Sequence, residues 1–198
     1  YDHHGNPGIA FYDDVDDDLR FAQRLPGFGW VHNTVDTDGT VGQYPSLAFD
    51  RHERPAISYR DPNNNGLKFA HFNGSSWDIE RVDIGGSTGL HTSLAFDLLG
   101  RTAIAYQGNA FNIKYVRDTD GDFSFMDETP VNLDTLNTTL EIALSFDHLN
   151  RPMIAHRNTE DDLSFSMENP STGWMTTLIS SGSFAFPSLA IDPDTGYP

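Results

Sequence analysis

One six-residue phrase recurs along the chain at nearly constant spacing. It reads PSLAFD at residues 45–50, TSLAFD at 92–97, IALSFD at 142–147 and PSLAID at 187–192, and YD at residues 1–2 ends an earlier copy. The closing aspartates are therefore 45 to 50 residues apart. A period of this length is typical of repeat proteins, in which each copy is one supersecondary unit.

Each copy contains four short segments that are rich in β-branched and aromatic residues. The phrase is the first segment, and a turn separates it from the second, which reads GIAFY, AISYR, AIAYQ or MIAHR. The third reads LRFA, LKFA, IKYV or LSFS, and the fourth begins at Trp30, Trp77, Trp174 and, in the third copy, Phe123 or Phe125. Such runs, separated by turn residues, predict strands. No segment has a 3.6-residue apolar period, so we expect almost no helix.

Four antiparallel strands in one repeat of this length form a unit that cannot bury both faces alone. We therefore predict an all-β fold, a β-propeller of four-stranded antiparallel blades, with four repeats in one domain that covers residues 1–198. The blade boundaries fall at about 1–44, 45–91, 92–141 and 142–186.

The two ends of the chain contain complementary parts of one repeat. The first copy lacks its first strand, and PSLAID at 187–192 is a spare one. We expect this C-terminal strand to complete the first blade, because closure removes exposed sheet edges. Two alternatives remain: an arc of a larger propeller that has additional blades, or a homodimer that completes one ring. Because the sequence starts inside a repeat at Tyr1 without a methionine, we expect a processed chain or a piece of a longer one.

Composition restricts the function classes. The net charge is −17, from 29 acidic and 12 basic residues, which disfavours nucleic acid and anionic membranes as partners. There is no cysteine, which excludes disulfides, thiolate metal sites and cysteine nucleophiles. No apolar run approaches the roughly 20 residues of a membrane helix.

The turns before the tryptophans resemble a known repeat hallmark. They read LPGFGW at 25–30, FNGSSW at 72–77 and NPSTGW at 169–174. These resemble a degenerate Asp-box, the turn of sialidase-like propellers, and the whole repeat is similar to bacterial extracellular propeller repeats. The resemblance implies the propeller fold and an extracellular or cell-surface location. The Ser/Thr-x-Asp-x-Gly core of the box is absent, so the resemblance carries no activity.

Loops that join strands two and three emerge on the same propeller face as those that join successive blades. Dissimilar polar and aromatic residues occupy these equivalent positions, and their convergence at the channel mouth predicts a small-molecule site. They are Tyr12, Arg60, Gln107 and Arg157 at the ends of second strands, and Tyr44, His91, Glu141 and Phe186 before first strands. The alternative is that each is only a solvated residue of the mouth.

We predict a binding or scaffolding module that recognises a glycan or a protein through this face. A sialidase-like glycoside hydrolase is the alternative, with Arg60 and Arg157 holding a carboxylate and with Glu141 and Tyr44 as acid/base and nucleophile. That mechanism needs three clustered arginines, and only two are in place, which favours a binding protein over an enzyme. A third alternative is a propeller fragment without independent activity.

Acidic loops predict Ca²⁺ as the one candidate cofactor, because this ion prefers six to eight oxygen ligands. The alternating carboxylates of DTDGD give Asp118, Asp120 and Asp122 as candidate ligands. Further oxygen-rich loops occupy residues 13–18, 61–65 and 160–162. The alternative interpretation is that these loops are tight, solvated turns.

Overall fold

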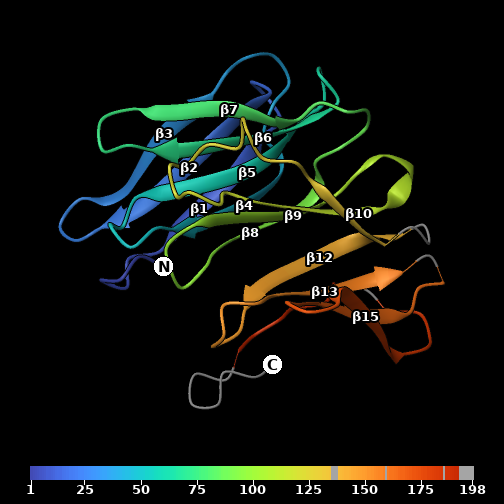
Figure 1. Cartoon of the computed structure of the whole chain (residues 1–198). Coiled ribbons are helices and arrows are strands. Elements are labelled where there is room, and N and C mark those ends of the chain that lie inside the picture. The colour runs from blue at the N-terminus through green and yellow to red at the C-terminus, as the bar shows by residue number, and fades with distance from the viewer. Residues whose placement is uncertain (135–137, 159, 185, 192–198) are drawn as a thin grey trace.

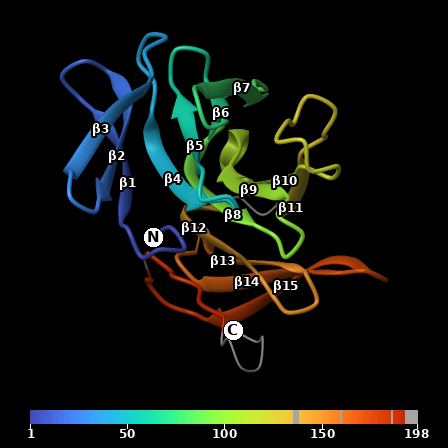
Figure 2. The same ribbon diagram turned by 90° about the vertical axis from the view of Figure 1, so that its left-hand side faces the viewer.

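The chain folds into four antiparallel sheets arranged side by side around a common centre. The computed structural model describes residues 1–134, 138–158, 160–184 and 186–191. Figure 1 shows the sheets in chain order, and Figure 2 shows β4, β8 and β12 as the strands nearest the centre. The described residues contain one helical segment, the short 3-10 helix Asn109–Phe111, and none that is long and apolar enough to cross a membrane.

Strands follow one another in chain order within each sheet. Among the described residues, sheet 1 has three strands, β1 (Gly8–Asp13), β2 (Asp18–Leu25) and β3 (Gly29–Asp36). Sheet 2 consists of β4 (Gln43–Phe49), β5 (Pro55–Asp61), β6 (Gly66–Phe72) and β7 (Trp77–Asp83). Sheet 3 consists of β8 (Leu90–Phe96), β9 (Thr102–Gln107), β10 (Ile113–Arg117) and β11 (Val131–Asp134). Sheet 4 consists of β12 (Thr138–Phe146), β13 (Pro152–Asn158), β14 (Leu163–Asn169) and β15 (Gly173–Ser180).

The described residues form three hydrophobic core clusters, one between each pair of neighbouring sheets. Phe21 and Val35 of sheet 1 pack against Ile57 of sheet 2. Sheets 2 and 3 meet around Phe69 and Ile104, and sheets 3 and 4 meet through the cluster of Ala105, Tyr115, Leu144 and Ile154. Neighbouring sheets therefore bury apolar positions against each other, as stacked repeats require.

The aspartate that closes each phrase organises the turn that follows. Oδ1 of Asp50 accepts the backbone N–H groups of His52 (2.8 Å) and Arg54 (2.9 Å), and Oδ2 accepts the Nε–H of Arg54 at 2.7 Å. Asp97 and Asp147 accept the same three hydrogen bonds from residues two and four positions later. A buried carboxylate with several charge-assisted partners is stable there, which explains why the repeat has aspartate at this position.

Polar side chains also join neighbouring sheets. Oδ2 of Asp36, at the end of β3, accepts hydrogen bonds from the Tyr59 hydroxyl (2.7 Å) and from Nζ of Lys68 (2.8 Å). The next pair of sheets repeats this arrangement through Asp83, Tyr106 and Lys114, at 2.8 Å from the tyrosine and 2.7 Å from the lysine. The only two lysines of the chain therefore have one structural role, at equivalent positions of the repeat.

Two sequence predictions need correction. Residues 187–191 of the expected closing strand form no strand, and sheet 1 keeps three strands among the described residues, so the sheets are not closed into a ring. Asp192 lies outside the described residues. The fourth strand of the third repeat begins at Val131 rather than at Phe123 or Phe125, because a loop is inserted there. Phe125 instead fills the core between sheets 2 and 3.

Candidate functional site

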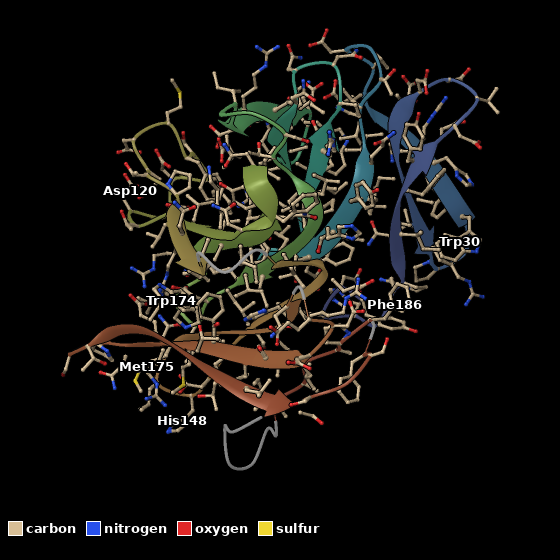
Figure 3. All side chains as sticks on the ribbon, turned by 90° about the vertical axis from the view of Figure 1, so that its right-hand side faces the viewer. Trp30, Asp120, His148, Trp174, Met175 and Phe186 are labelled. Carbon is tan, nitrogen blue, oxygen red and sulfur yellow. The ribbon has the colours of Figure 1, made fainter. Side chains whose placement is uncertain are left out.

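Four of the eight predicted mouth residues line one cavity. Tyr44, His91, Glu141 and Phe186 surround an open cavity of about 280 Å³, together with the residue that follows each of them. They come from β4, β8, β12 and the segment after β15. Figure 3 shows Phe186 on the side of sheet 4 that is nearer to sheet 1. Whether this cavity binds a ligand stays a prediction.

Irregular backbone directs these side chains to the cavity. The strand pairing shifts between Gln43 and Ser46 in β4, and β8 and β12 have shifts at the equivalent places. Such bulges re-aim a side chain relative to a regular strand. Tyr44, His91 and Phe186 have φ values of 51°, 49° and 58°. These values lie in the left-handed region of backbone conformation, which residues other than glycine seldom adopt. Strained backbone of this kind concentrates at functional sites.

Glycines two residues earlier make the shifts compatible with close packing. The N–H groups of Gly42 and Gly89 donate to the carbonyl oxygens of Arg60 and Gln107, both at 3.0 Å. A Cβ on Gly42 would lie 2.7 Å from the Cα of Leu19, and one on Gly89 would lie 2.8 Å from a backbone oxygen. The carbonyl groups of Arg60 and Gln107 thus hold the backbone that leads into Tyr44 and His91.

An aromatic pair forms one wall of the cavity. The rings of Tyr44 and His91 lie 4.5 Å apart at an angle of 46°. The hydroxyl of Thr92 donates to the carbonyl of Tyr44 at 3.0 Å and accepts from the hydroxyl of Ser58 at 2.8 Å. These bonds fix the backbone that carries the aromatic pair.

Glu141 of the cavity lining is paired with Arg157, which does not itself line this cavity. Nε of Arg157 lies 3.2 Å from Oε2 of Glu141, and its Nη1 lies 2.9 Å from Oδ1 of Asp161. The guanidinium thus already faces two carboxylates. Burial, together with the charge of Arg157, holds the pKa of His91 below its ordinary value, although the charge of Glu141 opposes this. The imidazole is therefore neutral at pH 7.

The other predicted residues do not line this cavity. The hydroxyl of Tyr12 donates to Asp17, and Nη2 of Arg60 donates to the hydroxyl of Ser87 at 3.3 Å. Gln107 is buried within sheet 3. The two arginines of the glycosidase hypothesis are therefore engaged by different partners, Arg60 by Ser87 and Arg157 by Glu141.

The structure brings together the three candidate calcium ligands. Carboxylate oxygens of Asp118, Asp120 and Asp122 lie within 4.8 Å of one another, so they could supply three oxygen ligands. Asp118 is buried, which raises its pKa, and its oxygens accept the N–H groups of Gly121 (2.6 Å) and Phe123 (3.1 Å). Figure 3 shows Asp120 on an outlying loop, far from Phe186. Calcium binding there remains a prediction.

Two other acidic loops use their carboxylates internally. In the loop at residues 13–18, Arg20 pairs with Asp16 at 2.6 Å, with Asp13 at 3.3 Å and with Asp18 at 3.5 Å. At residues 61–65, Asp61 accepts the side-chain amide of Asn64 at 2.7 Å. In both loops, carboxylates are therefore engaged by neighbouring protein groups, and calcium binding at these loops stays a prediction.

A groove between sheets 2 and 3 was not indicated by the sequence pattern. It has a volume of about 470 Å³, and Arg54, His71, Glu80 and Phe123 are among its lining residues. The rings of His71 and Phe123 stack with their centres 4.0 Å apart, and Arg54 lies over the same phenyl ring at 5.3 Å. The extra length of the third repeat between its third and fourth strands was the one available signal.

No family model matches the sequence, and no curated protein matches it. Solved structures with a similar fold exist at low identity. AofleA from Arthrobotrys oligospora has a TM-score of 0.69 at 14% identity, over 90% of this chain and 54% of that one. The Aleuria aurantia lectin, described as a six-bladed β-propeller with a novel fucose recognition mode, has a TM-score of 0.64 at 11% identity, over 91% of this chain and 58% of that one.

A third similar structure has no known function. It is a protein from Dyadobacter fermentans, with a TM-score of 0.65 at 12% identity, over 98% of this chain and 70% of that one. These likenesses show the fold: sheets 1 to 4 are a propeller-like array of blades that is not closed. The chain spans less than two thirds of the length of AofleA and of the Aleuria aurantia lectin.

Proposed function

We propose that this chain is a carbohydrate-binding module that holds a sugar in the cavity lined by Tyr44, His91, Glu141 and Phe186. The observation that carries the proposal is that the aromatic pair of Tyr44 and His91 lines the same cavity as the carboxylate of Glu141, which Arg157 pairs from outside the lining. A sugar presents C–H faces that pack on aromatic rings and hydroxyl groups that bond to a few fixed polar groups. A small concave site with this composition suits such a ligand.

The charges of the site favour a neutral sugar over an acidic one. Arg157 is already paired with Glu141 and Asp161, so a sugar carboxylate would have to compete with two protein carboxylates. The net charge of −17 also repels anions. Both points argue against the sialidase-like alternative and support a lectin-like role, for which an extracellular or cell-surface location is the natural one.

Similar structures suggest the first sugar to test. The SapL1 lectin, with a TM-score of 0.68 at 16% identity over 90% of this chain, was solved in complex with α-methyl fucoside. A glycan array with the intact chain, followed by calorimetry with α-methyl fucoside and other neutral methyl glycosides, tests the proposal. N-acetylneuraminic acid serves as the acidic comparison.

A pair of aromatic variants links the binding to the cavity. Tyr44→Ala removes one wall, and we expect at least about tenfold weaker binding, which corresponds to about 1.4 kcal/mol. Phe28→Ala is the matched control, because Phe28 is an exposed aromatic residue in the turn between β2 and β3, outside the cavity. Absence of any glycan binding by the intact chain, or equal affinity of the two variants, would refute the proposal.

A further inference from the structure

Within the part of the chain that the structure describes, no sheet packs on the face of sheet 1 that points away from sheet 2. Ile9 of β1 is 49% exposed, whereas the isoleucines at the same repeat position, Ile57, Ile104 and Ile154, are fully buried at 0%. Each of those three is buried because the preceding sheet packs on it. Sheet 1 thus presents half of an interface that occurs three times elsewhere in the molecule.

Sheet 4 presents the complementary half. Ile179 of β15 is 56% exposed, whereas its equivalent Val35 is 7% exposed and Val82 packs into the core between sheets 2 and 3. Ile179 lines an apolar cavity of about 310 Å³ with Leu163 and Phe165. Sheets 1 and 4 are the first and last sheets of the open array, and Figure 2 shows sheet 1 at the left and sheet 4 at the bottom.

Polar residues at the two uncovered faces are matched to each other. Two of the three internal interfaces, that of sheets 1 and 2 and that of sheets 2 and 3, place a largely buried aspartate against a tyrosine and a lysine of the next sheet. At the free face of sheet 4 this aspartate is replaced by Ser180, and a lysine buried there would lack its carboxylate, at a large cost. At the free face of sheet 1 the tyrosine and lysine are replaced by Phe11 and Arg20, and Arg20 has its own carboxylates in the loop at residues 13–18.

A strand is missing where the two faces would meet. A groove of about 390 Å³ runs between β1 and β4, lined by residues that include Gly8, Ala10, Leu47 and Phe49. In the complete sheets, the serine of the phrase accepts the leucine N–H of the next sheet: Leu94 to Ser46 and Leu144 to Ser93, both at 3.0 Å. Ser188 lies at this place in the unpaired PSLAI of residues 187–191.

We propose that the free face of sheet 4 binds the free face of sheet 1 in a second copy of this chain, head to tail. Residues 187–191 of the first copy lie in the groove between β1 and β4 of the second copy and supply its missing strand. Ser188 then accepts the N–H of Leu47, which continues the serine links of the internal interfaces. Heterologous contacts of this kind form a ring where the rotation closes and an open assembly where it does not.

Light scattering and sedimentation of the intact chain over a concentration series test the proposal. We expect a mass above that of the 22.0 kDa monomer that increases with concentration. Ile9→Asp and Ile179→Asp each place a carboxylate in the apolar junction, and each should weaken association by at least about 100-fold. Leu98→Asp is the control, because Leu98 is also an exposed apolar residue, in a turn outside both faces.

A mixing experiment establishes the head-to-tail direction. A mixture of the Ile9→Asp and Ile179→Asp variants should regain association. The sheet 4 face of the first variant and the sheet 1 face of the second are both unsubstituted, so these two faces can still form a junction. Hydrogen exchange of the Leu47 amide should be slower in the assembled wild type than in Ile9→Asp. A monomer at every concentration, including one closed by its own residues 187–191, overturns the proposal. Dissociation by Ile179→Asp without any effect of Ile9→Asp also overturns it.

Discussion

The ammonium nitrogen of Lys68 lies 2.8 Å from a carboxylate oxygen of Asp36, and the two residues belong to neighbouring sheets. Both side chains are almost completely buried, and Tyr59 donates to the same oxygen. The pair therefore holds sheets 1 and 2 in register through charge rather than through apolar packing alone.

Lys68→Met leaves a buried carboxylate with only neutral partners, the Tyr59 hydroxyl and the Asp38 N–H, and we expect the free energy of unfolding to fall by about 3–5 kcal/mol. Urea unfolding followed by tryptophan fluorescence measures this change. The double variant Lys68→Met/Asp36→Asn should recover part of the loss, because it removes the uncompensated charge. Arg81→Met, at an exposed cation, serves as the control and should change stability little. Equal losses in Lys68→Met and Arg81→Met would contradict the role given to the pair.

Gly89→Ala tests the backbone that positions His91. Gly89 has a φ of 84°, and an added Cβ would lie 2.8 Å from the backbone oxygen of Gly66, so strain and steric overlap act together. We expect a loss of about 2 kcal/mol or more in the free energy of unfolding. Gly74→Ala is a matched control, since Gly74 also has positive φ but nothing within 4 Å of its Cβ position. A loss in Gly89→Ala no larger than that in Gly74→Ala would contradict the steric part of the argument.

Asp97 makes stability sensitive to acid. Burial alone would raise the pKa of its carboxyl, but hydrogen bonds from Arg117 and Arg101 outweigh burial and lower the pKa to about 2. Because the unfolded-state pKa is about 3.9, this stabilisation is complete above about pH 4 and is lost as the pH falls towards 2. Asp97→Asn should unfold more easily at pH 7, and its urea midpoint should depend less on pH between about 4 and 2. Parallel pH profiles of wild type and variant would exclude this assignment.

His91 reports on the charges of the cavity. Its pKa is lowered by burial and by Arg157, while the charge of Glu141 acts in the opposite direction. Glu141→Gln removes the opposing charge, so we expect the pKa of His91 to fall further below about 6.5. NMR titration of the imidazole Cε1 proton measures both values. A rise in the pKa after Glu141→Gln would show that Glu141 does not act on His91 in this way.

The repeat was readable from the sequence because each copy has to meet the same physical demands. Apolar residues alternate so that both faces of a sheet can pack on neighbours, and the phrase ends in an aspartate that its own turn requires. The antiparallel four-stranded unit and the missing first strand of sheet 1 were predicted on these grounds. The convergence of Tyr44, His91, Glu141 and Phe186 followed from their equivalent positions in the repeat.

Only the tertiary structure decided how the ends of the chain are placed and which polar groups meet. Residues 187–191 carry the strand phrase but form no ladder, because strand pairing depends on a partner edge in space and not on the strand's own pattern. The sequence predicted both Arg60 and Arg157 at the channel mouth, because they occupy equivalent positions of the repeat. In the structure, however, Arg60 donates to Ser87, whereas Arg157 pairs with Glu141. Sequence periodicity thus determined which backbone positions are equivalent, whereas the direction of long side chains depended on loops that differ from copy to copy.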